Sequence, residues 1–300
     1  MAEERPHVFR GIVCALLGGI AWGFSGNCGE VLMHSFGAPP EWLTPLRMLI
    51  GGLFFLAFSI AFDRQRLAAA IHDGRSFIMI ALFGVFGVMM MQYTYLCAID
   101  WAGAGTALTL EQLNVVFVMV WLCLRHRRLP RARELAGVVL AFAGVVVIAT
   151  QGDLTVLNVP LLGLVWGIAS ALATAFYNLL PARPLEKYGT PVVNGYGMLF
   201  GFLACSALMR PWDHEVALPP EGWLVFAGLV GVGTIAAYFL YIQGVKDAGP
   251  MRASLLACSE PVAGTFIAAV WTGSAVSVWD VIGLVLIIAM VCLVTQRDAA

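Results

Sequence analysis

Four ionisable side chains lie inside long apolar stretches of the sequence: Glu30, Arg47, Glu111 and Glu260. A charge in such a stretch is costly when the stretch spans a membrane, and it then usually faces a cavity or a partner. The forked guanidinium of Arg47 suits a carboxylate. A carboxylate in an apolar environment is suited to taking up a proton on one side and releasing it on the other. These residue types indicate solute binding and proton exchange.

Each of these residues also has a structural interpretation. Arg47 is expected about 9 Å from one face of the membrane, at 1.5 Å per helical residue, and Glu30 lies at a similar depth from the same face. The two therefore form either an ion pair or part of a binding site. Glu111 either carries a proton or hydrogen-bonds to a neighbouring helix.

Glu260 is followed directly by Pro261. A proline inside a helix lacks the backbone N–H and clashes one turn back, which frees the carbonyl of Ala257. We expect a hinge or kink at Pro261. Glu260 is then either a binding residue at the kink or a partner of the freed backbone groups.

Uncharged polar and aromatic residues extend the candidate set. Asn27 and Asn178 each follow a run of small residues, so we expect them to line one cavity from opposite halves of the chain. The further candidates for substrate binding or coupling are Gln112, Asn114 and Tyr177, and the candidate aromatic contacts are Trp22, Tyr93, Trp166 and Tyr238. Aromatic residues at such positions are alternatively interface anchors or packing.

Covalent catalysis and metal chemistry find little support. Residues 23–26 read GFSG, which matches the GxSG of rhomboid-type proteases, but the serine needs a base and no His lies mid-span. The sequence holds no HExxH pair, no Asp cluster within a span and no CxxC pair, so its seven Cys are expected to be small hydrophobic residues. We expect no enzyme activity, no catalytic residue, no metal and no cofactor.

The elements that position these residues follow from composition. Of 300 residues, 60% are hydrophobic and 12% are charged, with a mean hydropathy of +0.86. A soluble domain carries about 25% charge, so lipid must be the solvent of this chain. The net charge of −1 excludes a nucleic-acid binder built on a basic face.

Apolar stretches of about 20 residues, the length of a helical span, occur ten times. They run over 11–34, 42–62, 76–98, 102–124, 134–151, 160–181, 191–210, 222–245, 249–272 and 277–296. The predicted fold is an all-α integral membrane protein with ten transmembrane helices.

Basic residues predict the orientation of these spans. All but two of the 17 Lys and Arg fall in the termini or in alternate loops, and the exceptions are Arg47 and Arg210. Because Lys and Arg concentrate on the cytoplasmic side, both termini are expected in the cytoplasm.

The chain also resembles itself. A shift of 146 residues aligns Ala102-Gly103 with Ala248-Gly249, and a shift of 152 aligns the small residues of span one with those of span six. We predict two repeats, 1–151 and 152–300, each with five spans. An odd number of spans inverts the second copy, and inverted repeats are typical of alternating-access transporters with a midplane site.

The motifs resemble those of EamA-type proteins of the drug/metabolite transporter superfamily. Span one contains the segment GGIAWG at 18–23, span two contains Pro45-Leu46-Arg47, and the second repeat contains Ala253–Leu256 followed by Glu260-Pro261. The two repeats differ, because Asn114-Val115 stands where Glu260-Pro261 stands in the second copy.

The resemblance implies a secondary transporter of a small metabolite, such as an amino acid or amine, in the inner membrane. It also implies export as the direction, whereas alternating access is predicted from the inverted repeats and protons as a coupling ion from the buried Glu111. The partners expected are therefore the small-molecule substrate, the lipid bilayer and protons, with no nucleic acid. The alternative is a flippase or exporter of lipid-linked sugars or amphiphilic drugs on the same fold. A channel is a further rival, but the sequence shows no filter loop.

Overall fold

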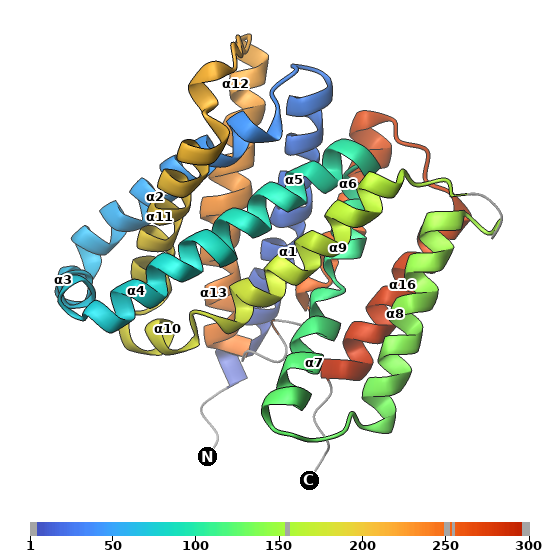
Figure 1. Ribbon diagram of the computed structural model, residues 1–300, viewed down its shortest axis with the longest axis horizontal. Helices are drawn as coiled ribbons and strands as arrows, with labels where there is room; N and C mark the ends of the chain where they lie inside the picture. Colours follow the sequence, from blue (N-terminus) through green and yellow to red (C-terminus); the bar gives the residue numbers. More distant parts are fainter. Residues whose placement is uncertain (1–4, 154–156, 249–252, 254–255, 296–300) are drawn as a thin grey trace.

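The computed structural model describes residues 5–153, 157–248, 253 and 256–295 (Figure 1). Within these residues the chain forms helices and no strand. This confirms the all-helical part of the prediction, which followed from the long uninterrupted apolar stretches.

Eight helical segments are long and apolar enough to cross a membrane. They are Val8–His34, Pro40–Phe62, Gly74–Ala102, Ala104–Arg125, Ala132–Thr150, Leu161–Leu179, Thr190–Met209 and Pro220–Ala248. They match the first eight predicted spans to within a few residues at each end. A shorter apolar helix, Val278–Leu293, matches the predicted span 277–296. The predicted span 249–272 begins outside the described residues, and only its later part is seen.

The described elements run in the following order. They are α1 (Arg5–His34), α2 (Pro40–Phe62), α3 (Arg64–His72), α4 (Gly74–Leu82), η1 (Phe83–Met89), α5 (Met90–Ala102), α6 (Ala104–Glu111), α7 (Asn114–Arg125), α8 (Ala132–Thr150), α9 (Leu161–Leu179), α10 (Ala182–Tyr188), α11 (Thr190–Met209), η2 (Pro211–Asp213), α12 (Pro220–Ala227), η3 (Gly228–Ala236), α13 (Ala237–Ala248), α15 (Ser259–Ile267), η4 (Ala268–Thr272) and α16 (Val278–Thr295).

Two segments that the sequence analysis treats as loops are short helices instead. These are α3, after the second span, and α10, after the sixth. Lys187 in α10 forms an ion pair of 2.7 Å with Asp73, which lies between α3 and α4. The two short helices are therefore joined across the end of the molecule. An apolar-run criterion misses them because they are short and rich in polar residues.

The long helices pack in pairs that are distant in sequence. α1 packs along α13, α2 along α11, α5 along α9, and α8 along α16 (Figure 1). Small residues allow these close approaches. A Cβ atom on Gly18 would lie 3.1 Å from the backbone nitrogen of Tyr241, and one on Gly52 would lie 3.2 Å from Cβ of Met198. Of the small residues predicted to form a groove in the first span, Gly11 and Ala15 face α13, whereas Gly19 and Gly23 face α15 and the turn before it.

Several spans are not regular α-helices. η1, η3 and η4 are π-helical segments within the third, eighth and ninth spans. The fourth span breaks at Gln112-Leu113, between α6 and α7, and a turn at Cys258 precedes α15. π-segments within α-helices are frequent at functional sites. Apart from η4, these interruptions adjoin residues that line the candidate site described below.

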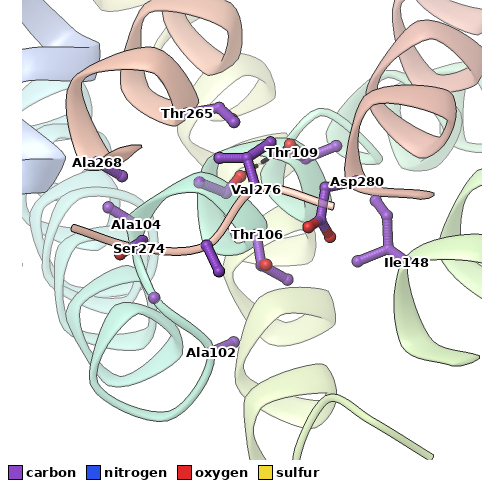
Figure 2. A pocket seen from close by; sticks show the side chains of 13 residues that line it. Ala102, Ala104, Thr106, Thr109, Ile148, Thr265, Ala268, Ser274, Val276 and Asp280 are labelled. Atoms are coloured by element: carbon purple, nitrogen blue, oxygen red, sulfur yellow. Dashed lines mark hydrogen bonds between the residues drawn. The ribbon is translucent and has the colours of Figure 1, made fainter. Parts of the chain in front are cut away.

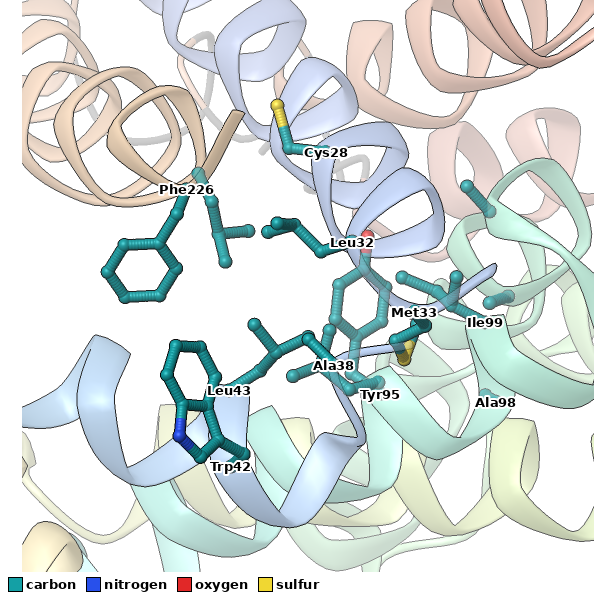
Figure 3. Packing of buried hydrophobic residues seen from close by; sticks show 14 of the residues in the cluster. Cys28, Leu32, Met33, Ala38, Trp42, Leu43, Tyr95, Ala98, Ile99 and Phe226 are labelled. Carbon is teal, nitrogen blue, oxygen red and sulfur yellow. The ribbon is translucent and has the colours of Figure 1, made fainter. Parts of the chain in front are cut away.

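A buried apolar cluster joins α1, α2, α5 and α12 (Figure 3). It includes Leu32, Leu43 and Phe226, with Trp42 placing its ring centroid 5.8 Å from that of Phe226. Tyr95 belongs to the same cluster. This packing closes the bundle at the end opposite to the start of α1 and the end of α16, which lie together (Figure 1).

Candidate functional site

A cavity of about 410 Å³ lies between helices from both halves of the chain. Its polar and aromatic lining comprises Trp22, Ser25, Arg47, Gln92, Tyr95, Glu111, Thr174, Tyr177, Asn178, Thr190, Thr234, Tyr238, Tyr241 and Glu260. Leu185 in α10 and Val245 near the end of α13 also line it, so the cavity extends toward the end of the molecule where α1 begins. Its size fits a small metabolite.

Arg47 is placed in the cavity by α2 and held by a residue of the other half. Its side chain is buried, with 8% exposed. Its Nε donates a hydrogen bond of 2.9 Å to Oγ1 of Thr234 in η3. A buried guanidinium needs partners, and in the described part of the chain Thr234 is the residue that provides a hydrogen bond to it.

Glu111 is the last residue of α6, directly before the break in the fourth span. Its Oε1 accepts a hydrogen bond of 2.7 Å from Oγ1 of Thr174 in α9. Its backbone carbonyl accepts a bond of 2.8 Å from the side chain of Asn114. The break leaves this carbonyl without a helical partner in the next turn, and Asn114 satisfies it.

Glu260 is the second residue of α15 and Pro261 is the third. The first turn of a helix has no internal hydrogen bond to lose, so Pro261 is tolerated at the start of α15. The interruption predicted at Pro261 lies just before it, in the turn at Cys258. The Glu260 carboxylate lines the cavity and forms no hydrogen bond or ion pair with another described residue.

Aromatic side chains form one wall of the cavity. The hydroxyls of Tyr177 and Tyr238 are hydrogen-bonded at 2.6 Å. The ring of Trp22 lies edge-on to that of Tyr238, with centroids 5.7 Å apart, and its centroid is 5.1 Å from that of Tyr241. Aromatic pairs with this spacing are rigid, so they present fixed ring surfaces to a bound molecule.

Five of the candidates chosen from the sequence therefore line the cavity together with the aromatic pair Trp22 and Tyr238. They are Arg47, Glu111, Tyr177, Asn178 and Glu260. Asn114 and Gln112 lie beside the lining rather than in it. Asn114 is linked to the cavity through its Oδ1, which accepts a bond of 3.4 Å from Asn178.

Asn27 and Glu30 lie outside the cavity lining and have backbone partners. The Asn27 amide donates to the carbonyls of Gly23 and Gly264, at 2.9 and 3.0 Å. The Glu30 carboxylate accepts a bond of 2.8 Å from the backbone nitrogen of Ala104, the first residue of α6. Glu30 and Arg47 thus have different partners in this structure, and the ion pair considered above is not formed between them.

Tyr93 and Trp166 also lie outside the lining. The Tyr93 hydroxyl donates to Glu41 at 2.9 Å, and its ring is edge-on to Trp166 with centroids 5.9 Å apart. This pair packs α5 against α9. Both residues are partly buried, and the pair serves as packing between the two helices.

Five polar, non-aromatic lining residues were not among the binding candidates of the sequence analysis: Ser25, Gln92, Thr174, Thr190 and Thr234. A Thr or Ser in an apolar span is inexpensive, because its hydroxyl bonds to the preceding turn. Such residues therefore carry little signal in one sequence. Gln92 has a costlier amide, and its position in the middle of the third span would have been a usable signal.

A second and smaller cavity lies between α6, α8, α15 and the segment before α16 (Figure 2). Thr106, Thr109 and Asp280 are among the residues that line it. Asp280 accepts hydrogen bonds from the Gln151 side chain at 2.6 Å and from the Ser277 backbone at 2.9 Å, so it caps the start of α16. Among the described residues no group of three or more His, Cys, Asp and Glu could hold a metal ion.

The fold and the cavity together define a multi-pass membrane protein with a polar site between its helices. Comparison with known families gives the same class. The chain belongs to the EamA-like transporter family, which matches it twice, over residues 9–150 and 161–296.

Individual relatives are similar along most of the chain. The chain is 29% identical to the uncharacterized inner membrane transporter YicL of Salmonella typhimurium, over 95% of both chains. It is 25% identical to a protein of the same organism named a probable amino-acid metabolite efflux pump, covering 92% of this chain and 91% of that one. A crystal structure with 19% identity covers 97% of this chain and 98% of the other at a TM-score of 0.62, which supports the fold.

Proposed function

We propose that this protein is a secondary transporter that moves a small metabolite, an amino acid or a related amine, across the inner membrane. The observation that carries the proposal is the cavity in which Arg47, Glu111 and Glu260 converge from α2, α6 and α15. One cation and two carboxylates in a shielded cavity can hold a solute that carries both charges, because each charge of the solute finds an opposite partner.

Alternating access is supported by the pairing of the helices. If the second five spans repeat the first five, α9 corresponds to α1 and α13 corresponds to α5, so the α1–α13 and α9–α5 contacts are equivalent. In the same way α11 corresponds to α2 and α16 to α8, so the α2–α11 and α8–α16 contacts each join two equivalent helices. The two separate family matches have the same division. We therefore infer two inverted repeats, 1–151 and 152–300, that rock around the cavity.

The cavity extends to the end of the molecule that carries most of the basic loops. If this end is cytoplasmic, as the basic residues predict, the structure is the state that receives solute from the cytoplasm. We propose export as the direction of transport, and the relative named as an amino-acid metabolite efflux pump supports that direction.

Glu111 is the proposed proton carrier. It lines the cavity next to the break in the fourth span, and a single hydroxyl, that of Thr174, binds its carboxylate. A carboxylate held by a single hydrogen bond can take up and release a proton as the cavity opens in turn to the two sides of the membrane. Glu260, which has no described partner, is the proposed site for the ammonium group of the substrate.

The test uses the purified full chain in liposomes. All common amino acids and their amines are screened by counterflow, while a pH dye inside the vesicles records proton movement. We expect substrate uptake accompanied by proton movement in the opposite direction. Glu111→Gln should reduce the proton movement more than about 10-fold, because glutamine cannot carry a proton.

Glu221→Gln is the matched control, because Glu221 is exposed at the start of α12, away from the cavity. Its transport should equal that of the wild type. Uptake without proton movement would reject proton coupling and leave the transporter assignment in place. Uptake of an amphiphile and of no amino acid or amine would favour the flippase alternative.

A further inference from the structure

The hydrogen bonds of Arg47 leave its terminal nitrogens free. A guanidinium has five N–H donors in a planar fork. The Nε of Arg47 is bound to Thr234, while Nη1 and Nη2 have no hydrogen-bond partner among the described residues. The side chain is 92% buried and lines the cavity. The two terminal nitrogens are therefore donors that are open to whatever occupies the cavity.

The orientation of Arg47 depends on Thr234. The Thr234 hydroxyl donates to the carbonyl of Leu229 at 3.4 Å, five residues earlier, so its oxygen can accept from the Arg47 Nε. A threonine in an α-helix bonds to the carbonyl three or four residues earlier, whereas the π-helical η3 offers the carbonyl at five. The π-segment thus determines where the Thr234 hydroxyl points.

The methyl group of Thr234 is restrained by α2, the helix that carries Arg47. A Cβ atom on Gly51 would lie 3.3 Å from the Thr234 Cγ2 methyl. Gly51 is four residues after Arg47, one turn along α2. The methyl group packs against Gly51 while the hydroxyl accepts the hydrogen bond from Arg47. These two contacts with α2 are compatible with a single χ1 rotamer of Thr234.

We propose that Thr234 is a positioning residue that turns the Arg47 fork into a subsite for an oxyanion, and that the transported solute carries a carboxylate. With Nε occupied, Nη1 and Nη2 are the donors left for the two oxygens of a carboxylate. The cavity also contains Glu111 and Glu260. Together with Arg47 these give a formal charge that is negative, which disfavours a dianion such as phosphate. The site also holds charges of both signs, so each end of a zwitterion finds an opposite charge.

This inference rests on the proposed function and narrows it. Amino acids and amines were equal candidates above. The open terminal nitrogens of Arg47 distinguish the two classes, because an amine without a carboxylate gives these two donors no acceptor. A site built to bind a polar group discriminates strongly against analogues that lack it.

The test compares matched trios with purified full-length protein. Each amino acid that the wild type binds is measured with its amide and its decarboxylated amine, and affinity is obtained by calorimetry. We expect the wild type to bind the acid at least about 10-fold more tightly than the amide or amine. Thr234→Val keeps the shape and removes the hydroxyl, so it should erase most of that preference while leaving amine affinity unchanged.

Thr234→Ser restores the hydroxyl and should restore the preference. Thr150→Val is the matched control, because the Thr150 hydroxyl bonds to the Val146 carbonyl within α8 and Thr150 is outside the cavity lining. It should keep the wild-type preference. A thermal melt of each variant shows whether it is folded.

Three results would overturn the inference. One is equal affinity of the wild type for acid and amine, which would leave the transporter assignment standing. Another is an equal loss of acid and amine affinity in Thr234→Val, or no recovery in Thr234→Ser, either of which would make Thr234 a packing residue. The third is a wild type that binds no amino acid, amide or amine, which would reject the proposed function as well.

Discussion

Asp73 shows how single residues connect the helices outside the spans. It lies between α3 and α4 and accepts hydrogen bonds from Lys187 at 2.7 Å, Tyr188 at 2.8 Å and the Ser76 hydroxyl at 2.7 Å. The ammonium of Lys187, followed by the bonds from Ser76 and Tyr188, holds the pKa of Asp73 well below its usual range. The same contact with Asp73 raises the pKa of Lys187. α10 is thereby tied to α3 and α4 beside the cavity.

The pH dependence of stability follows from the direction of these two pKa shifts. Asp73 has a lowered pKa in the folded state, so its contribution is present above its unfolded pKa, about 4, and is lost as the pH falls further. Lys187 has a raised pKa, so its contribution is present below about pH 10 and is lost as the pH rises. Between about pH 4 and about pH 10 both groups are charged, and the ion pair contributes its full stabilisation.

Replacement of Asp73 should therefore have a pH-dependent effect. At pH 7, Asp73→Asn is expected to lower the thermal midpoint in detergent by a few degrees. The difference from the wild type should narrow below about pH 4, and 0.5 M salt should reduce it because the pair is at the surface. Arg64→Gln, at an exposed residue of α3 without this contact, should leave the midpoint unchanged. A difference that is constant down to pH 2 would contradict the role of the ion pair.

At the scale of helices, the structure depends on close crossings through glycine. α1 crosses α15 at Gly23, where a Cβ atom would lie 2.6 Å from the Glu260 carbonyl oxygen and 2.7 Å from the Gly264 nitrogen. Both are backbone atoms, so the helices would have to separate. Asn27 reinforces the crossing by donating to the Gly264 carbonyl. This crossing also places Glu260 in the cavity.

Gly23→Ala should consequently affect both stability and binding. We expect a loss of about 1–3 kcal/mol in unfolding free energy from overpacking, together with weaker substrate binding as α15 moves. The control is Gly231→Ala in η3, where a Cβ atom would meet nothing within 4 Å. Thermal melts and calorimetry measure the two effects. Wild-type behaviour of Gly23→Ala would mean that the α1–α15 crossing is looser than the structure shows.

Helical boundaries also show what local sequence can predict. The ends of the first eight spans lie near their expected positions because charges, Pro and Gly end apolar runs. The break at Gln112-Leu113 and the π-segments η1 and η3 were not expected. The residues of η1 and η3 are as apolar as their neighbours, so composition does not mark these segments. The break in the fourth span, by contrast, falls in the polar stretch 111–114.

At the scale of the whole molecule, the basic segments gather at one end. Arg10 pairs with Asp247 at 2.7 Å, which joins the start of α1 to the end of α13. Lys187 pairs with Asp73 at the same end. The start of α1 and the end of α16 are found there too (Figure 1). The alternation of basic and non-basic loops in the sequence thus corresponds to two ends of the folded molecule.

This arrangement predicts the orientation in the membrane. A fluorescent protein fused to the C-terminus should fluoresce in cells, and alkaline phosphatase fused at the same position should be inactive, since both results indicate a cytoplasmic end. Fusions after Arg210, in a predicted outer loop, should give the opposite pattern. Active phosphatase at the C-terminus would reverse the proposed direction of access.

The membrane class, the approximate spans, the family resemblance and the rarity of charges within the spans can all be predicted from the sequence alone. These properties depend on composition and local order, which a sequence displays directly. It also identified Arg47, Glu111 and Glu260, because an embedded charge stands out against an apolar background.

Which side of each helix faces the cavity, by contrast, depends on how the helices pack in three dimensions. Lipid and protein interior are both apolar, so hydrophobic periodicity does not mark the inner face of a spanning helix. Asn27 and Glu30 are as polar as the lining residues, yet they bind the backbone of Gly264 and Ala104 instead. The pairing of Arg47 with Thr234 joins residues 187 positions apart, and no local pattern specifies a contact that forms when two distant helices meet.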